Sequence, residues 1–398
     1  MSRRTTTVSI LPIVFSLLFA TGCKSVIERQ DVRPRVLRDV PARNLAYRLT
    51  PDVSVPNNLE NDEQTDKDVN IANFFAGKRE NDALLRTIAS PDGKRILALY
   101  GTENEPPSAF RIDLFSSDGT FLRNLIPPDI SCLFPETVAW SPDGRFINFI
   151  ARKRVMPSPT PTPPNQPEPE EMPSPLGSPS IAPLFPPVAS FNTEQIYICN
   201  RDGYDLKPLT SREGLIYFYF AWSPDASAMV ALACKEDEWN ARERQYKLPA
   251  GRPRLITPDG GERLLDDGLT DALPVWSPDA SKVATAFDTD VVIYDTVQNN
   301  STQGRIPLGD LLIAASKSYE ERSGTKKANA NAATSPSPAA SSSATVPPSF
   351  NPIVRLQWPS PEALYFKTAY VRVMPSETIN TFQRWHQLSL SAQAAVLK

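Results

Sequence analysis

The chain has 398 residues, of which 40% are hydrophobic and 22% charged, and its formal net charge is −3. Lys and Arg are scattered rather than gathered on one periodic face, so composition and charge argue against a nucleic-acid partner. The 41 prolines are too many for one uniform fold, and most of the excess lies in two low-complexity stretches.

Residues 1–22 have the pattern of an export signal. Two arginines precede an apolar run over residues 8–20, which is shorter than the roughly 20 residues that span a bilayer. The run ends in ATGC, which resembles the bacterial lipobox, in which the Cys is acylated and becomes the first mature residue. We therefore predict a lipid anchor on Cys23 and a place in the bacterial cell envelope, at the outer membrane facing the periplasm or the cell surface. An ordinary signal peptide with an incidental Cys is the alternative.

Residues 23–83 are expected to form a tether and an N-terminal segment. Most of this stretch is polar and non-periodic, as in PNNLENDEQTDKD. The string NLAYRLT at residues 44–50 is different, because it resembles the last strand of the repeats described next. We expect it to pair with the C-terminal part of the chain, which would leave no edge of the ring unpaired.

A short motif built on Ser-Pro-Asp recurs from residue 84 onward. Its copies are IASPDGKRILAL, VAWSPDGRFINFI, FAWSPDASAMVAL and PVWSPDASKVATA, with a degenerate fifth copy LQWPSPEALYFKT. Each is an apolar alternation, a tight turn and a second alternation, which predicts a hairpin. The four Asp residues are interpreted as turn makers: Asp92, Asp143, Asp225 and Asp279. Ala226 and Ala280 replace the Gly of the turn, so a relaxed or wider turn is expected there.

A second hairpin follows each motif, with Asp-Gly as its turn in FSSDGTFLRNL, IYICNRDGYDLKPLT and RLITPDGGERLL. Each module therefore has four antiparallel strands, A to D. Modules of this kind, repeated at about 40 to 50 residues, are typical of propeller blades. We predict an all-β fold, a β-propeller with five recognisable blades. A sixth blade within residues 30–83 is the alternative.

These modules resemble the Pro-Asp propeller repeats of TolB-like proteins, in which WSPDGK-type strings recur. The resemblance covers residues 84–398 and does not include the small N-terminal α/β domain of TolB itself. It implies a propeller and little about function, because such propellers serve as binding domains, peptidase substrate gates and free-standing modules. One Trp occupies the same place in strand A of four modules, which favours packing between sheets over ligand stacking.

Two inserts interrupt the repeats, at about residues 155–190 and 315–349. The first is Pro-rich and the second is rich in Ala, Ser and Asn, so both are expected to be disordered. They belong to B–C and D–A connections, which leave a blade on the face opposite the Ser-Pro-Asp turns. This face also carries the other long loops, and variable loops on a rigid scaffold are where binding usually occurs.

The B–C loop of the third module contains the candidate binding residues Trp239, Arg242, Arg244 and Tyr246. Trp, Tyr and Arg dominate the energetics of protein interfaces, so a protein-contacting patch is one interpretation. A solvated loop or short helix with one aromatic ring packed on the rim is the other.

Catalytic and metal-binding patterns are scarce. His386 is the only histidine and has no nucleophile motif beside it. The sequence therefore predicts no enzyme, no metal and no cofactor, and buried roles for Cys199 and Cys234. A glycosidase with two carboxylates in the central channel is the alternative. The leading hypothesis is an envelope lipoprotein that binds a protein or peptide, with a structural role or a glycan ligand as the competing possibilities.

Overall fold

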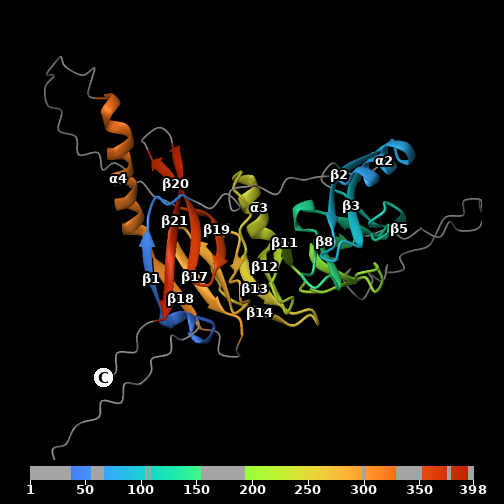
Figure 1. Cartoon of the computed structure of the whole chain (residues 1–398), viewed down its shortest axis with the longest axis horizontal. Coiled ribbons are helices and arrows are strands. Elements are labelled where there is room, and N and C mark those ends of the chain that lie inside the picture. The colour runs from blue at the N-terminus through green and yellow to red at the C-terminus, as the bar shows by residue number, and fades with distance from the viewer. Residues whose placement is uncertain are drawn as a thin grey trace, which may run out of the picture. The chain divides into compact units, whose positions relative to one another are not determined.

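The computed structural model describes residues 37–54, 67–103, 106, 109–153, 193–297, 302–328, 352–373 and 378–392. In this part of the chain, the strands form five antiparallel sheets, each of the size of a propeller blade. Figure 1 shows the sheets following one another in chain order. The fold is an all-β propeller of five blades, as the repeats predict.

The first three blades use consecutive strands. Blade 1 consists of β2 (Asp82–Ala89), β3 (Arg95–Thr102), β4 (Arg111–Ser116) and β5 (Phe121–Asn124). Blade 2 consists of β6 (Ile130–Cys132), β7 (Ala139–Trp140), β8 (Phe146–Lys153), β9 (Gln195–Asn200) and β10 (Lys207–Pro208). Blade 3 consists of β11 (Leu215–Trp222), β12 (Met229–Lys235), β13 (Arg252–Ile256) and β14 (Glu262–Leu264). In blade 2, β6 and β7 both pair with β8, so strand A is split in two by the short helix η3 (Pro135–Thr137).

The last two blades differ in how they are completed. Blade 4 consists of β15 (Val275–Trp276), β16 (Lys282–Phe287), β17 (Asp290–Asp295) and β18 (Gln303–Pro307). Blade 5 consists of β19 (Ile353–Ser360), β20 (Ala363–Val373) and β21 (Thr378–Ala392), and its fourth strand is β1 (Leu45–Thr50). β1 lies antiparallel to β21, with Leu45 opposite Ala392 and Thr50 opposite Gln387. The segment NLAYRLT thus supplies strand D of the last blade.

The stretch in which a sixth blade was the alternative forms no sheet of its own where it is described. Residues 37–54 form the short helices η1 (Leu37–Asp39) and η2 (Ala42–Asn44) and then β1, which belongs to blade 5. The helix α2 (Val69–Lys78) follows, and Asp68 caps it by accepting hydrogen bonds from the backbone N–H groups of Asn70 and Ile71.

Hydrophobic clusters join neighbouring blades, because two adjacent sheets bury their facing sides against each other. Separate clusters connect blades 1 and 2, 2 and 3, 3 and 4, and 4 and 5. The strand A tryptophans take part: the indole of Trp140 donates to the Ile88 carbonyl at 3.2 Å, and that of Trp276 to the Ala221 carbonyl at 3.0 Å. These residues pack between blades rather than facing a ligand.

The Ser-Pro-Asp turns share one hydrogen-bonding pattern. In blade 3, the Ser223 hydroxyl donates to the Asp225 carboxylate at 2.7 Å, and the Ala228 N–H donates to the Ser223 hydroxyl at 3.0 Å. The expectation of a relaxed turn at Ala226 and Ala280 is wrong. Their φ angles are 58° and 57°, close to the 67° of Gly93, so the turn is kept and the alanines adopt the left-handed conformation.

Two of the long connections contain helices. The helix α3 (Glu236–Arg244) lies in the B–C connection of blade 3, and α4 (Gly309–Ala328) lies in the D–A connection between blades 4 and 5. The prediction of disorder from residue 315 onward is therefore wrong for the first part of that insert. Leu312 and Ser316 are fully buried, which explains why the segment folds as a helix against the sheets. Residues 329–349 and the first insert, at about 155–190, lie outside the described residues.

Candidate functional site

The helix α3 is fixed to blade 3 by a bidentate ion pair. The Glu238 carboxylate accepts a hydrogen bond from the Lys235 N–H at 2.9 Å and two from the Arg252 guanidinium at 2.7 Å each. The Arg252 hydrogen bonds hold the pKa of Glu238 below its usual value. Fork-shaped pairs of this kind fix orientation as well as distance. The start of the helix is therefore rigidly placed.

Trp239, the first of the candidate binding residues, packs against the propeller. Its ring lies 5.9 Å from that of Phe134 and 5.6 Å from that of Phe218, and it borders a small cluster with the buried Cys234. Phe134 has a φ of 62°, an unusual conformation for an aromatic residue. Trp239 thus anchors α3 and offers a partner little of its ring.

Both candidate arginines donate hydrogen bonds within the protein. Arg242 donates from Nε to the Leu248 carbonyl at 2.6 Å and from NH2 to Asp271 at 3.1 Å. Arg244 donates from Nε to the Asn240 carbonyl at 3.1 Å. Arg242 in particular holds the chain after the helix in a fixed conformation.

Tyr246 is presented to solvent, with 98% of its surface exposed, and Arg244 is exposed as well. It follows the last turn of α3, where its N–H donates to the Glu243 carbonyl and the Lys247 N–H donates to the Arg242 carbonyl. These two bonds form a Schellman motif, whose left-handed position is usually Gly. Tyr246 occupies that position with a φ of 53°, and Leu248 beside it is 72% exposed. The structure therefore holds an aromatic side chain outward in a strained conformation.

The four turn aspartates lie on the other face of the blades. Each accepts a hydrogen bond from the Ser two residues before it and from the backbone two residues after it. Burial raises the pKa of Asp225, but bonds from Ser223 and Ser227 outweigh it and lower the pKa. Asp92 also pairs with Arg201 of blade 2 at 2.8 Å. Cys23, the predicted acylation site, lies outside the described residues.

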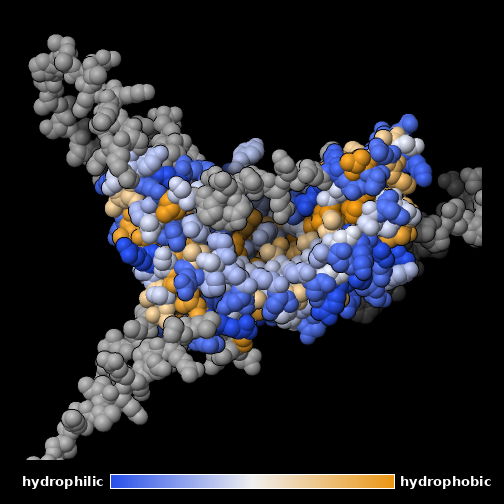
Figure 2. All heavy atoms as spheres, viewed as in Figure 1, coloured by the Kyte–Doolittle hydropathy of each residue, from blue (hydrophilic) through white to orange (hydrophobic). Residues whose placement is uncertain are grey.

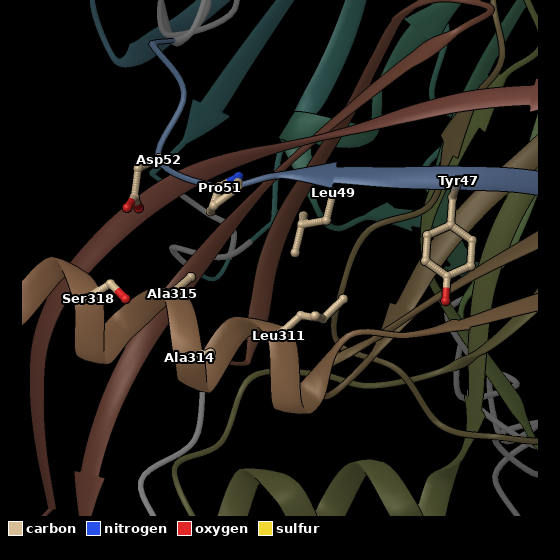
Figure 3. A pocket seen from close by; sticks show the side chains of 8 residues that line it. All are labelled: Tyr47, Leu49, Pro51, Asp52, Leu311, Ala314, Ala315 and Ser318. Carbon is tan, nitrogen blue, oxygen red and sulfur yellow. The ribbon is translucent and has the colours of Figure 1, made fainter.

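A second site, which the sequence did not suggest, lies between β1 and α4. It is a groove of about 780 Å³, and Figure 3 shows the strand and the helix as its two walls. Its lining residues are Tyr47, Leu49, Pro51, Asp52, Leu311, Ala314, Ala315 and Ser318. Hydrophobic side chains reach the surface where these two elements lie (Figure 2). Tyr47 and Leu311 are exposed by 41% and 49%.

Both walls of this groove are held by Arg384, a buried residue of β21. Its guanidinium donates to the Asp52 carboxylate after β1, to the Ala315 carbonyl at 3.2 Å and to the Ser316 hydroxyl at 2.5 Å. Asp52 and Arg384 are 332 positions apart in the chain, so no local pattern could have revealed the site. The groove is preformed because one side chain fixes both of its walls.

Among the described residues, those with catalytic or metal-binding potential are dispersed. His386 is fully buried and lies 2.9 Å from the Thr368 hydroxyl, so substrate cannot reach it in this conformation. Burial raises the pKa of Asp113 to about 6 and also raises that of Glu194, but both lie on or next to strand C of their blades. Strand C is an interior strand, whereas a central channel is bordered by an edge strand.

The part of the chain that the structure describes has neither a metal-binding cluster nor a membrane-spanning helix. It contains no group of three or more His, Cys, Asp and Glu residues arranged to hold a metal ion. Its three cysteines, Cys132, Cys199 and Cys234, are buried, and Cys199 and Cys234 are not joined by a disulfide. Within the same residues, no helix has the length and hydrophobicity needed to cross a membrane.

Comparisons with known proteins found solved structures only. No protein-family model and no curated protein match the chain. The similar structures include an oligogalacturonate lyase in complex with manganese, at 9% identity and a TM-score of 0.37, over 74% of this chain and 64% of that one. Prolyl oligopeptidase B from Galerina marginata is similar at 10% identity and a TM-score of 0.40, over 88% of this chain and 43% of that one. A eukaryotic initiation factor is similar at 8% identity and a TM-score of 0.37, over 79% of this chain and 58% of that one. The chain thus spans less than two thirds of each of these proteins.

The expectation that this chain is not an enzyme is corrected by these findings. Two of the similar structures, the lyase and the peptidase, are enzymes. A scarcity of catalytic motifs in a propeller sequence therefore does not establish a non-catalytic protein.

Proposed function

We propose that this chain is a TolB-like envelope lipoprotein whose propeller binds a protein or peptide partner through the end of α3. The main support for this proposal is the conformation of Tyr246, which is 98% exposed and has a φ of 53°. A non-Gly residue in this conformation costs about 1 kcal/mol, and an exposed ring gains almost no packing energy in return. Strain that the fold does not need is a reason to infer a contact with a partner.

The neighbouring residues support a rigid contact surface. Leu248 is 72% exposed, and its carbonyl is held by Arg242 at 2.6 Å. A backbone that is already held in one conformation loses little entropy when its side chains bind a partner. Tyr is also among the residues most enriched in interface hot spots.

The envelope location is supported by the export signal and the ATGC string at residues 20–23. Metabolic labelling with a palmitate analogue tests it, with Cys23→Ser as the control variant. If the Cys23→Ser variant is still labelled, or if the wild-type chain is not labelled, the prediction of a lipid anchor on Cys23 is wrong.

The partner is best tested by site-specific cross-linking in cells. A photoreactive amino acid at position 246 is expected to give one discrete cross-linked product. The same amino acid at position 94, an exposed residue on the Ser-Pro-Asp face, is the matched control and should give none. Identification of the product by mass spectrometry would name the partner.

Tyr246→Gly separates binding from folding. We expect this variant to be more stable than the wild type by about 1 kcal/mol, because Gly adopts the left-handed conformation freely, and yet to lose most of the partner in pull-downs. Partner recovery equal to that of the wild type would refute the role of Tyr246. Ala226→Gly, which relieves the same strain away from this surface, should leave binding unchanged.

A further inference from the structure

We infer that the groove between β1 and α4 is a second binding site, which takes an extended peptide segment as an additional strand on β1. This site is separate from the end of α3, and the inference does not depend on the proposed function. It rests on the position of β1 in its sheet, on the two walls of the groove and on the charge beside it.

β1 is the terminal strand of blade 5, in the order β1-β21-β20-β19. One of its edges pairs with β21, and the other pairs with no strand of the described part of the chain. With six residues it is longer than the outer strands of blades 1, 3 and 4, which have four, three and five. An edge of this length offers a row of backbone donors and acceptors to an added strand.

The helix α4 supplies the side-chain contacts. Figure 3 shows Tyr47 and Leu49 of β1 pointing toward the helix, where Leu311, Ala314 and Ala315 form the facing wall. Side chains directly opposite each other on neighbouring strands lie on the same face of a sheet. A peptide strand added to β1 would therefore direct every second side chain toward α4. Apolar side chains suit these positions, because the lining is mainly apolar.

Arg48 lies between Tyr47 and Leu49 on β1 and determines which peptide side chain fits opposite it. It is exposed, and it points to the opposite face of the sheet from Tyr47 and Leu49 because side chains alternate along a strand. An acidic side chain directly opposite Arg48 would form a cross-strand ion pair. The fitting ligand is thus an extended peptide with the pattern apolar, acidic, apolar opposite Leu49, Arg48 and Tyr47.

The groove is ready for such a ligand without rearrangement. Leu312, fully buried, packs α4 into the core of blades 4 and 5, and Arg384 ties the helix to the end of β1 through Asp52. A site whose walls are already fixed loses less free energy to ordering when the peptide binds.

The test uses fluorescently labelled heptapeptides with Glu at the centre and Val, Leu or Phe on either side, titrated against the full chain by anisotropy. At least one is expected to bind saturably. Leu311→Asp, on a half-exposed helix position, should weaken binding about tenfold or more. Arg48→Glu should reverse the preference, so that a Lys-centred peptide binds better than the Glu-centred one. Both variants are checked for wild-type melting behaviour first.

N-methylation of the peptide identifies strand addition. In an added strand, alternate residues turn their N–H groups toward β1, so methylating one alternate set should abolish binding and methylating the other should not. Three results would overturn the inference: no saturable binding of any of the peptides, equal binding by wild type, Leu311→Asp and Arg48→Glu, or equal effects of the two methylated sets. If Leu311→Asp fails to fold, the charge reversal at Arg48 and the methylated peptides still decide the question.

Discussion

Blades 1 and 5 are the two ends of the series, and each buries one ion pair with the opposite arrangement of charge. In blade 1 the acid is on the sheet: Asp113 of β4 is fully buried and pairs at 2.7 Å with Arg79, which follows α2. In blade 5 the base is on the sheet: Arg384 of β21 pairs with Asp52, which follows β1. Each pair attaches a segment from outside the repeats to a terminal blade.

The faces of the two blades differ as well. The face of blade 1 that turns away from blade 2 is apolar, and α2 covers it with Ile71 and Phe75. Blade 5 packs Leu388 and Leu390 toward blade 4, while the alternating residues Trp385, Gln387 and Ser389 lie on its other face. Among the described residues, no hydrophobic cluster joins blade 1 to blade 5. The outer face of blade 1 is thus covered by a helix, whereas that of blade 5 carries polar side chains beside the buried Trp385.

Arg384→Met should have the largest effect on stability. Removing the guanidinium leaves Asp52, the Ala315 carbonyl and the Ser316 hydroxyl without this partner at a buried site. Loss of one member of a buried pair costs about 3 to 5 kcal/mol. Urea unfolding is the measurement, and Arg305→Met, which breaks an exposed pair with Asp290, is the control with an expected loss below about 1 kcal/mol. Equal losses in the two variants would contradict the role given to Arg384.

A buried group in blade 1 and one in blade 5 should change the free energy of unfolding with pH in opposite directions. Burial raises the pKa of Asp113 from 3.8 to about 6, so the native state binds this proton more tightly and its contribution to stability is lost as the pH rises through 6. Burial, with the nearby charge of Arg384, lowers the pKa of His386 from 6.5 to about 4, against a weaker opposing effect of Asp52. That contribution is present above pH 6.5 and is lost as the pH falls toward 4.

Between pH 4 and 6.5 the contributions of Asp113 and His386 to the free energy of unfolding change in opposite directions and nearly cancel in the wild type. Each amounts to about 3 kcal/mol at most. Asp113→Asn should make the protein more sensitive to acid than the wild type, and His386→Gln should make it less sensitive. The free energy of unfolding in urea, measured from pH 4 to pH 8, checks both signs. Two variants with the wild-type pH profile would show that neither group titrates as described.

Arg79→Met should have a smaller and pH-dependent effect. Arg79 also lies over the rings of Phe75 and Tyr100, at 5.5 and 5.0 Å, so its loss loosens α2. We expect a loss of about 2 kcal/mol at pH 7.5, where Asp113 would be left charged and buried. The loss should shrink at pH 5, because a protonated Asp113 needs no counter-charge. A loss independent of pH would mean that the ion pair contributes little beyond packing.

The sequence predicted the blades well because each repeat has its own turn and its own apolar alternation. Even β1, the N-terminal strand that completes blade 5, could be recognised from the string NLAYRLT. The β1–α4 groove was missed because its key contact, between Asp52 and Arg384, joins the two ends of the chain. The helix α4 was missed because its Ala- and Ser-rich sequence has a weak apolar period, and burial of Leu312 and Ser316 decides its structure. At α3, the sequence named the right loop but could not distinguish Trp239, which packs, from Tyr246, which is exposed.

The smallest predicted effect concerns the turns, where the sequence-based expectation failed. Ala226→Gly and Ala280→Gly should each raise the free energy of unfolding by about 0.5 to 1 kcal/mol, because Gly adopts a φ near +57° without the steric cost that Ala pays. The reverse change, Gly93→Ala, should cost about 1 kcal/mol, and a Cβ there would meet no atom within 4 Å, so the backbone alone is responsible. Thermal and urea unfolding of all three variants tests this. If Gly93→Ala stabilises the protein, a left-handed backbone conformation does not strain a non-Gly residue in these turns. The argument from backbone strain at Tyr246 would then lose its basis as well.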